Sequence, residues 1–349
     1  MKRLSSSRMM SILFAVMVAT TLFLGPGVSK TPAKSKVWNI KMQLYTVPGK
    51  WDCQWVVPEK FGELINKHTK GRVNISIHPA GELVGPREIW TSVSAGTIDA
   101  GATLSVYEGG THPEFSYGLG TVYTIEEHYE IMHAGALDIL QKQALDESIR
   151  IIGYFPLVPY YAVSMKHGFA KTLEDLKGKK IRSMGGVSAS FLKRAGAGTV
   201  TLPMSEVPAA LQTGVVDGIH TGLAGPYAMK LWDVAPYFTA NAHGDNDFYI
   251  LMNEDVYGGL PADIKAGIAA AQRDLEPWYI EWDKEFRKHI VQDSEAKGLK
   301  WYFTAAEEDK RWQKLLTEAT VEWVMKREAK VGKQLYEVVE RVTGRKVLQ

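Results

Sequence analysis

The stretch that decides the fold is Leu176–Gly218, with the sequence LKGKKIRSMGGVSASFLKRAGAGTVTLPMSEVPAALQTGVVDG. It alternates short strand-like runs with segments of helical spacing. The expected strands are Ile181–Ser183, Val200–Leu202 and one that starts at Val215–Gly218. The expected helices are Ser188–Ala195 and one that has Ser205 as its N-cap and ends at Gly214. Two strand–helix–strand crossings in so short a span predict a parallel α/β sheet.

Arg182 is the candidate anchor for a ligand in this stretch. It lies where a strand gives way to the glycine-rich turn Gly185–Gly186, and open α/β sheets bind ligands at such strand ends. A guanidinium can hold a carboxylate or a sulfonate through two parallel hydrogen bonds. The alternative is a surface arginine beside Lys179 and Lys180, and position alone leaves that alternative open.

The order of the motifs resembles the DctP family, the extracytoplasmic substrate-binding proteins of TRAP transporters. The matching pieces inside the deciding stretch are Leu176–Arg182, Ala195–Ala197, Ser205–Val207 and Ala210–Gly218. A further match lies upstream, where GRVNISIHPAGELVGPREIWTSVSAGTIDAG occupies Gly71–Gly101. The resemblance implies that Arg182 pairs with the acid group of the substrate.

The resemblance also implies the architecture. Family members have two α/β lobes, a ligand cleft between the lobes and a long helix that bridges both. Carried over, lobe one comprises residues 37–159 and 248–287, and lobe two comprises residues 160–247 and 288–349. Long helical regions are expected over Pro261–His289 and Ala305–Arg341, and an earlier helix is expected to start at Pro58 and Glu59.

Residues 1–33 have the features of a secretory signal peptide. Lys2, Arg3 and Arg8 precede an apolar run from Met9 to Leu24. An uncleaved anchor is the alternative, but the run is short for a membrane span. The formal net charge of +2 falls to −1 once these three basic residues are removed. A nearly neutral mature chain argues against nucleic acid as a partner.

Other ligand contacts are expected where loops and strand ends face the cleft. Trp51 and Gln54 lie in the loop after the first strand, and core packing is an equally good account of Trp51 and Tyr160. Where some family members have a metal-holding acidic residue and a tryptophan, this chain has Ile219, His220 and Thr221, so a bound metal is not expected. The full set of candidate substrate-binding residues is Arg182, Trp51, Gln54, Tyr160, Ser105, Met204, His220, Thr221, Asn246 and Asp247.

Sequence motifs of catalysis are absent. The chain has no G-x-S-x-G, no P-loop and no dinucleotide-binding glycine fingerprint, and its nine histidines form no H-x-H or H-x-x-x-H pair. The missing motifs argue against an enzyme that uses a cofactor. The resemblance to the DctP family implies instead a protein that captures a small organic anion in the periplasm and delivers it to the TRAP permease. The substrates expected are monoanions such as hydroxy acids, oxo acids or sulfonates similar to isethionate. A secreted enzyme acting on a small organic acid in the same cleft is the alternative.

The first prediction concerns export. Because a positive segment precedes an apolar run, the leader should be removed as the chain enters the periplasm. Mass spectrometry of the periplasmic fraction should show a mature N-terminus between Lys30 and Val37. A full-length chain that stays in the membrane fraction would contradict this expectation.

Overall fold

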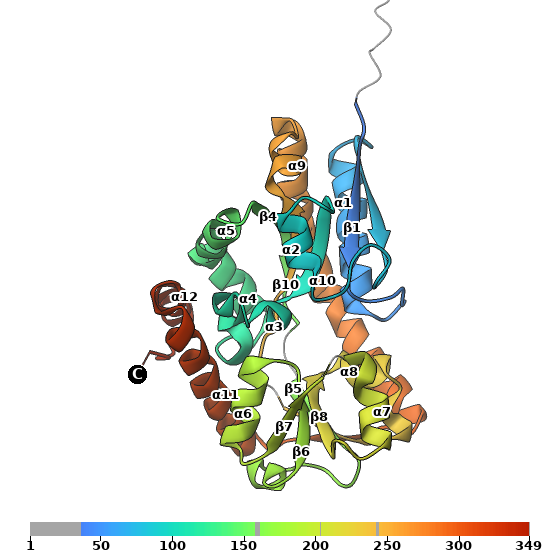
Figure 1. Ribbon diagram of the computed structural model, residues 1–349, viewed down its shortest axis with the longest axis vertical. Coiled ribbons are helices and arrows are strands. Elements are labelled where there is room, and N and C mark those ends of the chain that lie inside the picture. The colour runs from blue at the N-terminus through green and yellow to red at the C-terminus, as the bar shows by residue number, and fades with distance from the viewer. Residues whose placement is uncertain (1–35, 158–160, 203, 242–243, 349) are drawn as a thin grey trace, which may run out of the picture. The chain divides into compact units, whose positions relative to one another are not determined.

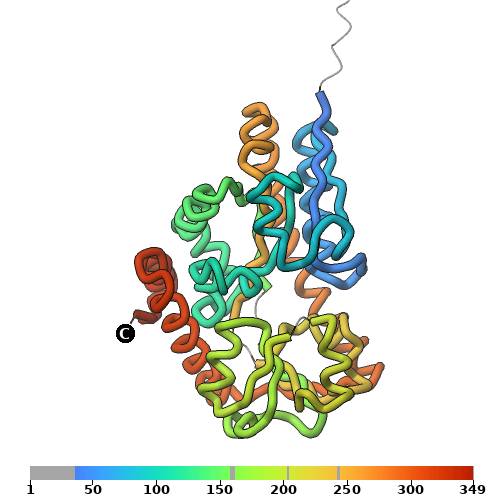
Figure 2. Tube along the Cα trace, in the orientation of Figure 1, coloured from blue at the N-terminus to red at the C-terminus, as the bar shows by residue number. Residues whose placement is uncertain are grey.

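The computed structural model describes residues 36–157, 161–202, 204–241 and 244–348. The described chain contains two mixed β-sheets with helices packed around them (Figures 1 and 2). The α/β architecture with a long helix, expected from the sequence, is confirmed. The two candidate lobes correspond to the surroundings of the two sheets, and their residue boundaries remain a prediction.

The first sheet has the strand order β2-β1-β3-β10-β4. Strands β1, β2 and β3 are parallel, whereas β10 runs antiparallel to both of its neighbours. Every residue of β3 and β10 is buried, so these central strands carry apolar or small side chains on both faces. The strands are β1 (Trp38–Leu44), β2 (Val73–His78), β3 (Ala100–Leu104), β4 (Ile149–Phe155) and β10 (Phe248–Asn253).

The second sheet has the order β11-β9-β5-β8-β6-β7. Strand β6 pairs in parallel with β7 and β8, which confirms the parallel arrangement predicted for the deciding stretch. Strand β5, the first strand of this sheet in the chain, is antiparallel to β8 and β9. The strands are β5 (Tyr161–Met165), β6 (Lys180–Ser183), β7 (Gly198–Thr201), β8 (Gly218–Gly222), β9 (Tyr237–Ala240) and β11 (Lys300–Phe303).

Helices cover the sheets, and one of them contacts both. The 35-residue helix α10 (Ala262–Ala296) packs against α1 and β4 beside the first sheet and against α8 and β11 beside the second. The other α-helices are α1 (Cys53–His68), α2 (Ile89–Ser94), α3 (Ser105–Glu108), α4 (Ile125–Ile131), α5 (Leu137–Leu145), α6 (Gly186–Arg194), α7 (Val207–Gln212), α8 (Ala224–Ala228), α9 (Glu254–Gly258), α11 (Ala306–Arg327) and α12 (Ala329–Thr343). Shorter 3₁₀ or π turns are η1 (Pro113–Gly120), η2 (Met132–Ala136), η3 (Leu173–Leu176), η4 (Met204–Glu206) and η5 (Leu231–Asp233).

Some helix boundaries differ from those predicted. Helix α1 begins at Cys53 rather than at Pro58, because the Asp52 carboxylate accepts a hydrogen bond from the Gln54 N–H and caps the helix earlier. Ser205 is not the N-cap of α7, since η4 inserts first and the helix begins at Val207. The expected strand start at Val215 is also too early, because the structure begins β8 at Gly218.

The C-terminal helical region is divided. The backbone of Glu328 leaves helical geometry, with φ −140° and ψ 68°, and this break separates α11 from α12. Helix α11 packs against both η1 and α6, while α12 packs against α4 and η1. Residues that follow the second sheet in sequence therefore also contact elements beside the first sheet.

The contact between η1 and α11 supplies a stability prediction. A Cβ added at Gly120 would lie 2.6 Å from the Leu316 carbonyl oxygen and 2.7 Å from the Thr320 hydroxyl oxygen. Backbone cannot give way cheaply, so Gly120→Ala should lower the free energy of unfolding by about 1–3 kcal/mol. Urea denaturation followed by circular dichroism measures this change.

The matched control is Gly258→Ala in helix α9, where an added Cβ has no heavy atom within 4 Å. That substitution should change stability by less than about 0.5 kcal/mol. Equal stability of the two variants would show that η1 and α11 are not in close contact in solution.

Candidate functional site

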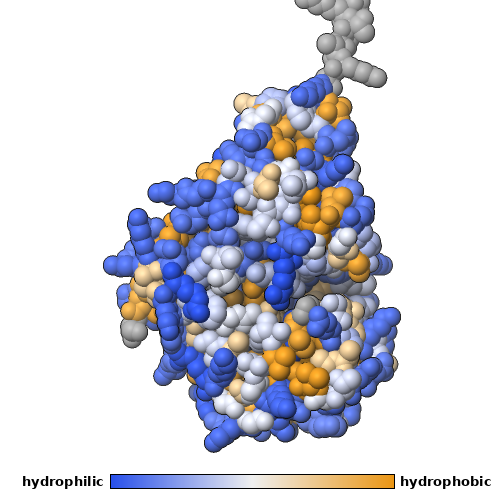
Figure 3. Space-filling model, in the orientation of Figure 1, coloured by the Kyte–Doolittle hydropathy of each residue, from blue (hydrophilic) through white to orange (hydrophobic). Residues whose placement is uncertain are grey.

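One cavity is enclosed by strand ends from both sheets and by α10. Its volume is about 490 Å³, within the roughly 300–1,000 Å³ range of small-molecule sites. The face drawn in Figure 3 is hollowed between the two halves, and apolar side chains gather beside this hollow. The residues that line the cavity include Tyr45, Thr46, Asp52, Cys53, Gln54, Tyr107, Arg182, Met184, Met204, Thr221, Met229, Asn246, Asp283, Phe286 and Arg287.

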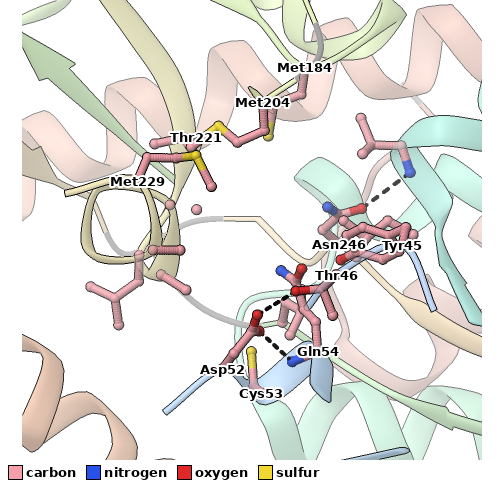
Figure 4. Close-up of a pocket in the computed structure, with 18 of the residues that line it drawn as sticks. Tyr45, Thr46, Asp52, Cys53, Gln54, Met184, Met204, Thr221, Met229 and Asn246 are labelled. Atoms are coloured by element: carbon pink, nitrogen blue, oxygen red, sulfur yellow. Dashed lines mark hydrogen bonds between the residues drawn. The ribbon is translucent and has the colours of Figure 1, made fainter. Parts of the chain in front are cut away.

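Two walls face each other across this space. Figure 4 shows Met184, Met204, Thr221 and Met229 on one side. The opposite side carries residues that precede or begin α1, together with a residue two positions before β10. These are Tyr45, Thr46, Asp52, Cys53, Gln54 and Asn246. Methionine side chains fill irregular space and adapt to different apolar surfaces. The second-sheet wall therefore offers an apolar contact surface with one cation beside it.

That cation is Arg182, near the end of β6. Its side chain is only 2% exposed, and its Nε donates to the Leu202 carbonyl oxygen at 2.9 Å. Nη1 also donates to the His220 carbonyl oxygen at 3.4 Å. Burial lowers the pKa of Arg182 to about 10, and no carboxylate among the described residues offsets that effect. The guanidinium is thus held by carbonyl dipoles and keeps a full charge that a ligand anion can neutralise.

Tyr107 extends the environment of this guanidinium. Burial raises the pKa of the Tyr107 hydroxyl, while the charges of Arg182 and Arg87 act in the opposite direction. Its ring meets the edge of the Tyr45 ring, with centroids 5.3 Å apart. The phenol therefore remains protonated and can donate a hydrogen bond at the same part of the cavity.

The first-sheet wall is ordered by the cap of α1. The Asp52 carboxylate accepts from the Thr46 hydroxyl at 2.5 Å and from the Gln54 N–H at 2.9 Å. Burial raises the pKa of Asp52, and these two hydrogen bonds act against that rise. The cap fixes the start of α1 and thereby the positions of Cys53 and Gln54 on the cavity wall.

Helix α10 contributes an internal ion pair to the cavity. The Nε of Arg287 donates to the Asp283 carboxylate one helical turn earlier. Burial raises the pKa of Asp283, and the hydrogen bond and charge of Arg287 oppose that rise. The positive charge of Arg287 is therefore already matched within the protein.

Asn246 is oriented by the loop after β3. Its side-chain oxygen accepts from the Ser105 hydroxyl at 2.9 Å and from the Val106 N–H at 3.2 Å. The bond to Val106 is drawn in Figure 4, where the amide nitrogen lies on the opposite side of the carboxamide. Because the oxygen is fixed by two donors, the amide N–H groups are left to face the cavity that Asn246 lines.

The predicted site residues separate into two groups. Arg182, Gln54, Met204, Thr221 and Asn246 line the cavity together. Ser105 lies behind Asn246 and bonds to it, as described above.

Three further predicted residues lie outside the cavity lining. The Trp51 ring stacks on the His289 ring at 4.1 Å, outside the cavity lining. His220 lies behind Arg182, and its Nδ1 is 2.8 Å from the Ser188 hydroxyl. Asp247 accepts from the Tyr249 hydroxyl at 2.6 Å and faces away from the cavity lining. Tyr160 lies outside the described residues, so its predicted role remains a prediction.

A single cluster of described residues brings three potential metal-binding side chains together, namely His128, Asp245 and Asp247. The His128 Nδ1 lies 2.7 Å from an Asp245 oxygen and 2.9 Å from an Asp247 oxygen. Ligand atoms around a tetrahedral zinc ion, at bonds of about 2.0–2.2 Å, stand farther apart from one another than this. The separations of 2.7 and 2.9 Å fit an imidazole that is hydrogen-bonded or ion-paired to carboxylates.

Comparison with known proteins gives the family. The profile of bacterial extracellular solute-binding protein family 7, DctP, matches residues 54–326, which is most of the chain. The chain belongs to this family. The C4-dicarboxylate-binding periplasmic protein DctP of Rhodobacter capsulatus is 26% identical over 262 residues, covering 74% of this chain and 78% of that protein.

Solved structures share the fold of this family 7 protein. A TRAP periplasmic solute-binding protein from Rhodoferax ferrireducens with bound malonate has a TM-score of 0.79 at 22% identity, covering 87% of this chain and 98% of that one. A Bordetella pertussis extracytoplasmic solute receptor binding pyroglutamic acid has a TM-score of 0.76 at 19% identity, covering 86% and 99%. These likenesses confirm the two-lobed α/β fold. No helix in the described part of the chain is long and apolar enough to cross a membrane.

Sequence reasoning missed several cavity residues of this family 7 protein. Asp52 and Thr46 would have been found if the helix had been started at the aspartate, which is a favoured N-cap residue. Asp283 and Arg287 have the spacing of an ordinary surface ion pair, and only the packing of α10 turns them toward the cavity. Met184 follows the end of β6, and Tyr107 lies in α3. Only the three-dimensional structure shows that both residues line the cavity.

Proposed function

We propose that this protein is the periplasmic substrate-binding component of a TRAP transporter, which captures a small organic monoanion and delivers it to the membrane permease. The anion is a carboxylate or a sulfonate. The observation that carries the proposal is the buried guanidinium of Arg182, which meets no carboxylate among the described residues of the cavity. The relatives named for C4-dicarboxylates, malonate and pyroglutamic acid all bind organic acids, which supports the ligand class.

The charges of the cavity favour one anionic group on the ligand. Among the described residues that line the cavity, Arg287 is matched by Asp283, whereas Arg182 is a buried cation with no carboxylate partner. The opposite wall carries the Asp52 carboxylate, which would repel a second negative group. Burying an unpaired charge costs several kcal/mol, so a dianion should bind less well than a monoanion.

The enzyme alternative receives little support from the geometry. A serine–histidine pair does exist, with the Ser188 hydroxyl 2.8 Å from the His220 Nδ1. Both side chains are about 1% exposed, and neither lines the cavity. A nucleophile has to reach the substrate, so this pair is better explained as support for the segment behind Arg182.

The proposal predicts a specific cost for altering Arg182. Arg182→Ala removes the anion anchor, and Arg182→Lys keeps the charge but loses the paired hydrogen bonds. Each should weaken binding of the preferred monoanion by about 2–5 kcal/mol, with the lysine variant toward the lower end. Isothermal titration calorimetry measures the change, and thermal melts confirm that each variant is folded.

The matched control is Arg194→Ala, because Arg194 lies in the adjoining helix α6 and pairs with surface glutamates Glu318 and Glu322. It should leave the affinity within about twofold of the unaltered protein. Unchanged affinity in Arg182→Ala would refute the anchor role.

A ligand panel tests the preference for one negative charge. Pyroglutamate, orotate and isethionate, which are monoanions near neutral pH, should bind more tightly than malonate, a dianion. Calorimetry provides the affinities, and mass spectrometry of the recovered ligand shows whether it is intact. Tighter binding of malonate would refute the monoanion preference, and conversion of the ligand would favour the enzyme alternative.

A further inference from the structure

A buried cluster of charged residues lies behind Asn246. His128 comes from α4, and Asp245 and Asp247 come from the segment that links β9 to β10. All three side chains are at most 1% exposed, and the His128 Nδ1 contacts both carboxylates, at 2.7 and 2.9 Å. The proposed binding function above gives no part to His128 or Asp245.

The three side chains of this cluster cannot all be charged without a cost in stability. One imidazolium balances one carboxylate, so a second ionised carboxylate would leave a net negative charge in the interior. The titratable groups packed around the cluster are tyrosines, with one carboxylate farther out, which itself faces the exposed His133 ring at 3.2 Å. They are Tyr117 in η1, Tyr129 in α4, Tyr154 in β4, Tyr249 in β10 and, hydrogen-bonded to Tyr154, Glu276 in α10.

The environment indicates which carboxylate holds the extra proton. Burial and the neighbouring charge of Asp247 raise the pKa of Asp245 well above its usual range. For Asp247, burial is outweighed by the His128 charge and by hydrogen bonds, including that from Tyr249, so its pKa is lowered. For His128, burial is outweighed by the two carboxylates, which raise its pKa to about 10. The Tyr249 hydroxyl also donates to Asp247 at 2.6 Å, a contact that favours the ionised carboxylate there and leaves the proton to Asp245.

Asn246 connects this cluster to the cavity. It stands between the two aspartates in the chain, so its backbone is fixed on both sides by residues that contact His128. The Asp247 carbonyl oxygen also accepts from the Ser105 N–H at 2.9 Å, beside the bond from the Ser105 hydroxyl to Asn246. The cluster therefore holds the same loop that turns the Asn246 amide toward the cavity.

We propose that His128, Asp245 and Asp247 form a proton-sharing positioning cluster, which fixes Asn246 so that its amide N–H groups donate to the anion held by Arg182. The inference rests on the proposed function, because it assumes that an anion binds in this cavity. The proton belongs to Asp245, and the single negative charge belongs to Asp247. None of the three side chains touches the ligand, so they act through Asn246.

Two matched substitutions test this assignment. Asp245→Asn replaces a neutral acid with a neutral amide of the same shape and should leave affinity within about twofold. Asp247→Asn removes the negative charge that balances the buried imidazolium and should weaken binding about tenfold or more. The probe is the tightest-binding member of the panel of pyroglutamate, orotate and isethionate. Equal weakening by the two variants would overturn the assignment.

A double-variant cycle separates positioning from general stability. Asn246→Ala should weaken binding of the same probe, and adding Asp247→Asn to it should cause little further loss, because both act through one amide. Additive losses would show that Asp247 does not work through Asn246. Thermal melts of each variant identify a loss that arises only from unfolding.

Nuclear magnetic resonance of the unliganded protein tests the cluster without any ligand. The ring nitrogens of His128 should stay in the imidazolium state from about pH 6 to pH 9. The Asn246 side-chain amide signals, assigned by their loss in Asn246→Ala, should keep their positions in Asp245→Asn and shift in Asp247→Asn. A neutral His128, or one bound metal ion per purified protein, would overturn the proposal. If no panel member binds, the proposed function fails while these spectra still decide the cluster.

Discussion

The cavity depends on a cation that the protein buries and does not neutralise. Arg182 is held in place by carbonyl oxygens, which orient the guanidinium but leave its charge unmatched among the described residues. Such a group is costly to bury alone, and an incoming anion recovers part of that cost. The two walls of the cavity differ in character around this unmatched cation. Apolar methionines lie on the wall beside the arginine, and hydrogen-bonding groups lie on the facing wall.

The buried ionic groups of the protein follow two different rules. In the His128 cluster, opposite charges and a shared proton bring the net charge close to zero, and the cluster is closed to solvent. At Arg182 the charge is left open toward a space that a ligand can fill. A closed cluster contributes orientation, while an open charge contributes affinity, and Asn246 lies between the two.

The sequence predicts the parts of this structure that depend on local pattern. Short strand and helix patterns with glycine-rich turns placed Arg182 near a strand end and predicted parallel strands in this stretch, because these features repeat over a few residues. Asp283 and Arg287 point toward the cavity because α10 packs against segments that are distant in the sequence. No local sequence pattern indicates this direction. His220 was expected at a strand end but lies in the middle of β8, where its ring contacts the Ser188 hydroxyl. Asp247 does directly precede β10, but its carboxylate lies beside His128, far away in sequence.

The place of β10 in the first sheet has a consequence for the order in which the chain folds. Strands β3 and β4 do not pair with each other, and each pairs with β10, which follows the second sheet's strands β5 to β9 in the sequence. A chain emerging from the ribosome therefore cannot complete its first sheet until Phe248–Asn253 has been synthesised. Long-range pairing of this kind slows folding, so the first sheet closes only after the chain has passed through strands β5 to β9 of the second sheet.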